Sequence, residues 1–241
     1  MLLLIIFILS SCAASPSQDP LAGIENAAVG TYTDLGGGRL YLPPGWKAED
    51  REKWPVTVIL HGYGTLSRSL SVMPFWIPLA EEYDLVLFFA DRGTMGWDER
   101  RDSLDTRLIE RILRTFRSKS WVRENSIQLF GWSAGAIMAQ GFTAINAKQK
   151  DGTPLFDSLA AASGGFGLIM DRERAGRGDP FAHSVRVPVY VFWGEAEASD
   201  HGKDAADFLT KNGWSVETST HPGGHVLPEE SVREVLSRNR K

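Results

Sequence analysis

Hydrophobic positions along the chain form short runs that are separated by longer segments with helical spacing. Seven runs have the length and composition of strands: Arg39–Leu42, Pro55–Leu60, Leu85–Ala90, Ser126–Phe130, Leu159–Ser163, Val187–Trp193 and Ser215–Thr218. Several of them are apolar enough to be buried on both faces of a parallel sheet. We expect the first run to be an antiparallel edge strand.

Amphipathic helices are predicted between these strands. In the clearest one, five apolar residues recur at helical spacing behind a cap at Asp102 or Ser103: Leu104, Leu108, Ile112, Leu113 and Phe116. Further helices are expected after Pro74 and over Ala134–Lys148, Lys203–Lys211 and Glu229–Ser237. This alternation predicts an α/β protein in which a mostly parallel central sheet has helices on both faces. The charged, Gly-rich segment Phe166–Arg186 has no clear period and is expected to form a loop or small lid.

Composition adds limits to this picture. The 241 residues are 43% hydrophobic and 23% charged, which is typical of one globular domain. With 26 basic and 30 acidic residues the net charge is −4, and nothing suggests binding to nucleic acid. Cys12 is the only cysteine, so no disulfide can form within the chain and stability must come from burial.

The amino-terminal residues differ from the rest. The apolar run Met1–Leu9 is too short to span a bilayer and stops at small residues, as an export signal does. Leu9–Cys12 resembles the lipobox of bacterial lipoproteins, which implies a signal over residues 1–11 and a lipid-modified Cys12. A plain secretory signal is the alternative, because no Lys or Arg precedes the apolar run. We therefore expect an exported cell-envelope lipoprotein, held on the membrane at Cys12, with a tether over residues 12–29 and a folded domain over 30–241.

The motif Gly131–Gly135 suggests the chemistry of that domain. It reads Gly-Trp-Ser-Ala-Gly and stands between the apolar run ending at Phe130 and a helical pattern, which is the context of a nucleophile elbow. The two glycines avoid clashes at the sharp turn that projects Ser133, and the Ala134 N–H at the helix start is a candidate oxyanion donor. The alternative is a Gly-rich turn with an incidental serine.

A serine nucleophile needs a histidine base, and the base needs an acid to orient it. In α/β-hydrolases the chain order is Ser, acid, His, which leaves four candidates for the base: His183, His201, His221 and His225. We predict His225, because it ends a Gly-rich loop after the last strand; His221 is the alternative and His61 is expected to be structural.

Loops after two other strands supply the remaining candidates. Glu197 follows the strand that ends at Trp193, at the position where related hydrolases carry the acid, and this resemblance predicts it as the acid, with Asp200 in the same loop as the alternative and Glu195 as a solvated charge. The turn His61–Gly64 follows another buried strand, and its Tyr63 N–H is expected to be the second oxyanion donor.

These motifs together resemble the α/β-hydrolase superfamily. Within it the chain is similar to the secreted polyhydroxybutyrate depolymerase and feruloyl esterase group, at Tyr41–Trp46, Val58–Gly62, Gly131–Gly135 and Gly223–His225. The resemblance implies ester hydrolysis without a metal or other cofactor: Ser133 attacks, His225 transfers the proton, Glu197 orients His225, and water releases the acyl group. Ala136 in place of a third elbow glycine, Glu197 in place of Asp and the absence of the group's cysteines depart from this pattern.

Three tryptophans next to the predicted catalytic loops are candidates for an aromatic subsite that binds an apolar or phenolic acyl group: Trp132, Trp193 and Trp97. Core packing is the alternative for them. The expected partner is a small or polymeric ester. A serine peptidase or other acyl hydrolase of the same fold would use the same triad. A non-catalytic surface-binding lipoprotein is the other alternative; it is expected to lack a triad member, whereas this chain has a candidate for each one.

Overall fold

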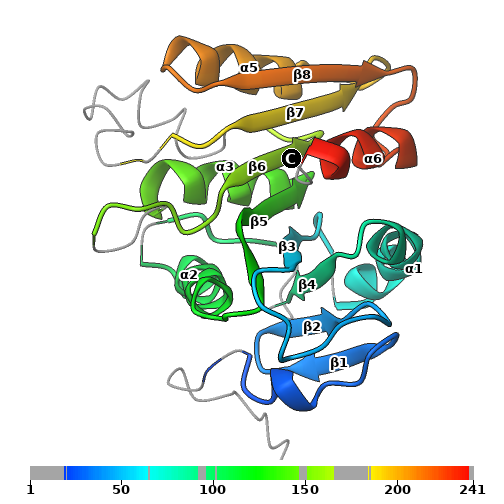
Figure 1. The fold of residues 1–241 in the computed structure, drawn as a ribbon. Helices are drawn as coiled ribbons and strands as arrows, with labels where there is room; N and C mark the ends of the chain where they lie inside the picture. Colours follow the sequence, from blue (N-terminus) through cyan, green and yellow to red (C-terminus); the bar gives the residue numbers. More distant parts are fainter. Residues whose placement is uncertain are drawn as a thin grey trace, which may run out of the picture.

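The computed structural model describes Asp19, Ser184 and residues 21–64, 66–91, 96–100, 102–146, 151–165 and 186–238, with the backbone alone for 66–73 and 145–146. Its centre is an eight-stranded sheet of order β1-β2-β4-β3-β5-β6-β7-β8 (Figure 1). The strands are β1 Tyr32–Leu35, β2 Gly38–Tyr41, β3 Trp54–Leu60, β4 Val86–Ala90, β5 Val122–Trp132, β6 Ser158–Ala162, β7 Val189–Gly194 and β8 Val216–His221.

Strand direction follows the expectation for most of the sheet. The strands from β4 through β3, β5, β6 and β7 to β8 pair in parallel, whereas β1 and β2 pair with each other, and β2 with β4, in antiparallel fashion. The α/β class with a mostly parallel sheet is therefore confirmed.

Two strand predictions need correction. The run around β2 is antiparallel but is not the edge of the sheet, because β1, which the hydrophobic pattern missed, pairs outside it. β1 has no fully buried residue, so it carries no apolar run. β5 begins at Val122 rather than Ser126. The hydrophobic pattern missed its first residues because Glu124 and Asn125 are polar and exposed.

Helices cover both faces of the sheet (Figure 1). On one face α2 (Leu104–Arg117), α3 (Ala134–Asn146) and α5 (His201–Lys211) contribute to one core cluster, and on the other face α1 (Leu66–Glu82) and α6 (Glu229–Arg238) contribute to a second. Among the described residues, no helix combines the length and apolar character needed to cross a bilayer.

Helix α1 corrects the expectation of a start after Pro74. It begins at Leu66 and contains both Pro74 and Pro78. Each proline removes one backbone hydrogen bond, and the two lie one turn apart with exposed side chains. The carbonyl groups that lose their partners therefore lie on the solvent side. Water can donate hydrogen bonds to them there, so the helix can continue.

The folded domain also begins earlier than residue 30. Leu21 and Ile24 are fully buried in the core, and Ile24 starts the short 3₁₀ helix η1 (Ile24–Asn26). The predicted boundary between residues 29 and 30 is thus too late, because two isolated apolar residues have no period to reveal them. The predicted signal at 1–11, Cys12, His183 and nearly all of the segment 166–186 lie outside the described residues.

Candidate active site

Ser133 lies at the sharp turn between β5 and α3, as the motif predicts. Its backbone has φ 55°, in the left-handed region that side chains other than glycine disfavour. The turn is fixed on both sides, because Ser133 N–H donates to the Ala162 carbonyl of β6 at 2.8 Å and the Ser133 carbonyl accepts from Ala136 N–H at 2.9 Å. This strained turn points the hydroxyl away from the sheet.

The two elbow glycines have the steric role that the motif implies. A Cβ on Gly131 would collide with the backbone of Gly135, and a Cβ on Gly135 would collide with the Leu60 carbonyl of β3. The backbone at the start of α3 therefore packs directly against the backbone of β3 and β5, with no side chain between them.

His225 meets Ser133 from the loop between β8 and α6. The distance from His225 Nε2 to Ser133 Oγ is 2.8 Å, within hydrogen-bond range. The loop is anchored next to β7, where Ala196 N–H donates to the Gly223 carbonyl at 3.1 Å. The alternative base, His221, is the last residue of β8; it is buried, its Nδ1 accepts a hydrogen bond from Gly223 N–H, and its carbonyl accepts one from Glu195 N–H.

Glu197 stands on the far side of the imidazole. Its Oε2 lies 3.5 Å from His225 Nδ1, which is longer than an ordinary hydrogen bond. Its Oε1 accepts from Gly194 N–H at 3.0 Å and from Ser163 Oγ at 2.5 Å. The Glu197 side chain is only 5% exposed, whereas that of His225 is 50% exposed.

The other acids of this loop are placed elsewhere. Asp200 is exposed at the start of α5, and among the described residues no contact joins it to His225. Glu195 accepts a hydrogen bond from Thr220 Oγ1 at 2.8 Å on the surface. The structure thus brings Glu197, and not Asp200, to the histidine.

The turn His61–Gly64 lies beside the elbow. A Cβ on Gly62 would lie 3.3 Å from Ser133 Cβ, so the backbone of this turn borders the serine. His61 is buried and its Nδ1 lies 2.7 Å from the Gly62 carbonyl, which can only accept, so this nitrogen carries the hydrogen. Among the described residues, the backbone N–H groups of Tyr63 and Ala134 have no protein acceptor.

The three tryptophans have different positions. The Trp132 ring stacks on His225 at 5.8 Å between centroids and lies against Gly62. Trp97 Nε1 donates to the His61 carbonyl at 2.8 Å, so this hydrogen bond helps to fix the turn His61–Gly64. Trp193 packs against Gly202 of α5 and against the core.

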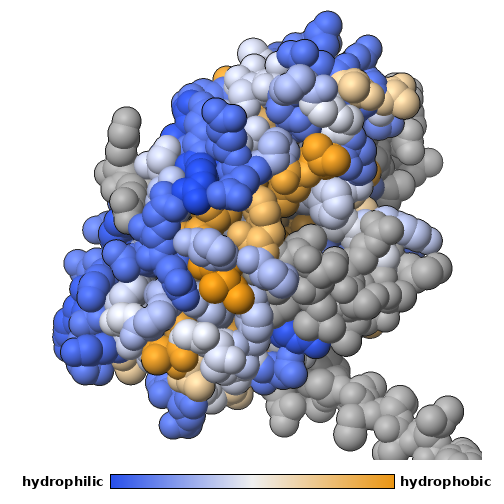
Figure 2. Space-filling view, turned by 90° about the vertical axis from the view of Figure 1, so that its right-hand side faces the viewer, coloured by the Kyte–Doolittle hydropathy of each residue, from blue (hydrophilic) through white to orange (hydrophobic). Residues whose placement is uncertain are grey.

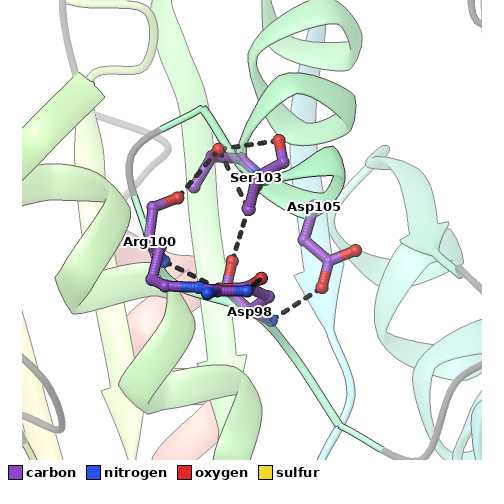
Figure 3. A network of polar contacts seen from close by, with 5 residues as sticks. Asp98, Arg100, Ser103 and Asp105 are labelled. Atoms are coloured by element: carbon purple, nitrogen blue, oxygen red, sulfur yellow. Dashed lines mark hydrogen bonds and ion pairs between the residues drawn. The ribbon is translucent and has the colours of Figure 1, made fainter.

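A polar network holds the segment that carries Trp97 (Figure 3). Asp98 N–H donates to the buried Asp105 carboxylate at 2.7 Å, and Ser103 Oγ donates to the Asp98 carbonyl at 2.6 Å. Ser103 is also the N-cap of α2, where it accepts from Thr106 N–H at 3.0 Å. The amino end of α2 is thereby linked through Trp97 to the turn beside Ser133.

Two large apolar side chains are exposed next to residues that border the serine. Tyr63 is 57% exposed next to Gly62, and Val226 is 51% exposed next to His225. Figure 2, which shows the side of the molecule that is at the right of Figure 1, has an apolar strip across its middle. In the part of the chain that the structure describes, no group of three His, Cys, Asp or Glu residues is placed to hold a metal ion.

One residue of this arrangement was missed by the sequence patterns. Ser163, whose Oγ contacts Glu197, follows directly after β6 and closes a predicted strand, Leu159–Ser163. The available signal was a polar residue at the carboxyl end of a parallel strand, where sites of open α/β sheets form.

Comparisons with known proteins agree with this fold. No protein-family model matches the sequence, and no curated protein matches it either. Among solved structures, an esterase of Pyrobaculum calidifontis is similar with a TM-score of 0.62 and 17% identity, over 94% of each chain.

Two structures from Staphylococcus aureus are also similar. The fluorophosphonate-binding serine hydrolase F has a TM-score of 0.62 and 11% identity, over 89% of this chain and 100% of its own. The S-formylglutathione hydrolase has a TM-score of 0.64 and 12% identity, over 84% and 92%. Together with the strand order, these similarities show that the chain has the α/β-hydrolase fold.

Proposed function

We propose that this chain is a serine hydrolase that cleaves carboxylic esters through an acyl-enzyme intermediate. The observation that carries the proposal is the 2.8 Å contact between Ser133 Oγ, on its strained elbow, and His225 Nε2. The elbow, the base and a buried carboxylate behind the base follow the carboxyl ends of three parallel strands of the sheet, β5, β8 and β7. Esterases and serine hydrolases among the structural neighbours support the same class.

The residues divide the reaction as follows. His225 Nε2 accepts the Ser133 proton while Oγ attacks the ester carbonyl, and Glu197 accepts a hydrogen bond from His225 Nδ1–H and stabilises the imidazolium. The N–H groups of Ala134 and Tyr63 donate to the oxyanion, each lowering the barrier by about 3 kcal/mol. His225 then protonates the leaving alcohol, and water, activated by the same histidine, releases the acid from Ser133.

The substrate we propose has an apolar or phenolic acyl group. Tyr63, which follows Gly62, and Val226, which follows His225, present exposed apolar surface, and neither adds a charge to the site. The resemblance to the polyhydroxybutyrate depolymerase and feruloyl esterase group points to the same kind of ester. Trp132 contributes by packing on His225, and Trp97 by holding the oxyanion turn.

The test is covalent labelling followed by substrate profiling. The purified domain is treated with a serine-reactive fluorophosphonate and the adduct is mapped by peptide mass spectrometry, with Ser133→Ala as the control. Short-chain p-nitrophenyl esters, methyl ferulate, a hydroxybutyrate oligomer and a peptide panel are then compared. Labelling at another residue would overturn the site, and turnover of peptides alone would overturn the ester class.

We further propose that the protein is exported and anchored to the membrane through a lipid on Cys12. The lipobox-like residues Leu9–Cys12 support this location. Full-length protein, expressed in a bacterium and fractionated, is expected in the membrane fraction, and Cys12→Ser is expected in the soluble fraction. A variant that remains on the membrane would contradict lipidation at Cys12.

A further inference from the structure

The carboxylate of Glu197 is held by more than the histidine. An ionised carboxylate can only accept, so the Ser163 hydroxyl is the donor in the 2.5 Å contact with Oε1. Gly194 N–H donates to the same oxygen at 3.0 Å. Both donors occupy Oε1, which leaves Oε2 for His225.

Ser163 is itself placed at unusual conformational cost. Its φ is 54°, in the left-handed region, and the residue is only 5% exposed. A serine in this conformation is expected where the surrounding structure requires its side chain. Glycine would fit the backbone without strain but would offer no hydroxyl.

The backbone connects Ser163 to both sides of the site. Ser163 N–H donates to the Phe192 carbonyl of β7 at 2.9 Å, and the preceding residue, Ala162, accepts from Ser133 N–H. The hydroxyl therefore has a fixed position relative to the nucleophile and to the acid loop.

We propose that Ser163 is a positioning residue that fixes the Glu197 carboxylate so that Oε2 faces His225. This inference rests on the proposed function. A glutamate has one more rotatable bond than an aspartate, and the hydroxyl of Ser163 together with the amide of Gly194 restrains that extra freedom. Ser163 touches neither the substrate nor the reacting atoms and acts through Glu197.

The test compares Ser163→Ala with Ser163→Gly. Both variants remove the hydroxyl, but the glycine variant also relieves the left-handed backbone and is expected to be at least as stable as the alanine variant. We expect kcat for p-nitrophenyl acetate to fall about tenfold in both, with KM changed by less than about twofold, because a lost hydrogen bond to a charged group has an effect of this size. The rate of fluorophosphonate labelling at Ser133 should fall in parallel.

A double-mutant cycle shows whether the effect passes through the carboxylate. In a Glu197→Ala background, Ser163→Ala is expected to have no further effect on kcat, because its acceptor is gone. Full additivity, unchanged kcat in both single variants, or activity that follows stability instead of the hydroxyl would overturn the role of Ser163 while leaving the esterase intact. Wild-type protein that neither labels at Ser133 nor hydrolyses esters would overturn the proposed function, and this inference with it.

Discussion

At the scale of single residues, the candidate site is a chain of contacts in which each member has one neighbour to orient it. Ser133 Oγ meets His225, His225 meets Glu197, and Glu197 meets Ser163. Burial changes along the same path, from a half-exposed imidazole to a carboxylate that is almost fully enclosed. A buried carboxylate requires hydrogen-bond donors. Removing the Glu197 carboxylate would therefore change both the orientation of His225 and the charge next to it.

The choice of acid gives the first prediction. Glu197→Gln removes the charge behind His225 and is expected to lower kcat at least about 100-fold, since loss of the acid in a Ser-His-Asp triad lowers kcat by up to about 10⁴. Asp200→Asn, three residues along the same loop, is the matched control and should change kcat less than twofold. Steady-state kinetics with a p-nitrophenyl ester measure both, and a larger loss in the Asp200 variant would reverse the assignment.

The support behind the oxyanion turn gives the second. Trp97→Phe keeps a ring but removes the donor to the His61 carbonyl, so the turn should become less well fixed and kcat/KM should fall about fivefold to tenfold. Trp46→Phe is the control, because Trp46 is a buried tryptophan whose indole nitrogen, among the described residues, has no partner. Equal losses of activity in the two variants would mean that Trp97 acts only through packing.

At the scale of elements, helix ends and strand ends hold the site. The amino end of α3 carries Ala134, and the amino end of α2 is tied to the segment that carries Trp97 (Figure 3). Each helix connects two parallel strands, α2 between β4 and β5 and α3 between β5 and β6, so its amino end lies toward the carboxyl ends of the strands. Their positive dipole ends thereby favour negative charge at that edge.

The cap of α2 is testable on its own. Ser103→Ala removes both the acceptor for Thr106 N–H and the donor to the Asp98 carbonyl, and is expected to lower the free energy of unfolding by about 1 kcal/mol. Ser118→Ala, at the exposed carboxyl end of the same helix, should change the free energy of unfolding by only about 0.3 kcal/mol. Urea unfolding followed by circular dichroism measures both, and equal effects at the two ends would argue against a specific cap.

Local patterns account for much of what the sequence predicts. The spacing of Gly131, Ser133 and Gly135 encodes a turn within five residues, and the parallel strands follow from short apolar runs. The loops after two of those strands carry Glu197 and His225, and the structure brings His225 to Ser133 and Glu197 to His225. Each of these features is recorded in neighbouring residues.

Features that depend on distant residues were missed or misplaced. Leu21 and Ile24 are buried by elements far along the chain, and β1 is recognisable only through its pairing with β2. The contact between Ser163 and Glu197 joins residues 34 apart and depends on the register of β6 and β7. Such features have no local signal, because the partner that creates them lies far away in the sequence and is not among the neighbouring residues.

At the scale of the whole molecule, the two antiparallel strands close one end of the sheet, with Tyr41 in the core and the partly buried Tyr32 packed against it. Burial raises the pKa of Tyr32 to about 12, and burial together with a hydrogen bond to Glu81 raises the pKa of Tyr41. A raised tyrosine pKa means that the folded state holds its proton more tightly than the unfolded state does. The stability from this source is complete below pH 10 and is lost as the pH rises from 10 towards 12.

Alkaline unfolding therefore gives a prediction at this scale. The free energy of unfolding, measured with urea between pH 8 and pH 11.5, should decline above pH 10, and Tyr32→Phe should make that decline shallower. Among the described residues the Tyr32 hydroxyl has no partner, so the variant should lose little stability at pH 8. Tyr63→Phe, at an exposed residue, should leave the slope as it is. A slope that does not respond to Tyr32→Phe would assign the alkaline loss to other groups.

The peptide unit between Ala162 and Ser163 has a consequence for how this scaffold can change. Its carbonyl holds the backbone of the nucleophile, and the hydroxyl that follows it holds the acid, so one rigid strand end sets the spacing of both. Surface residues such as Tyr63 and Val226 take no part in that spacing. Under the proposed function, substitutions of these two side chains are expected to change the selectivity for acyl groups while the reactivity of Ser133 stays the same.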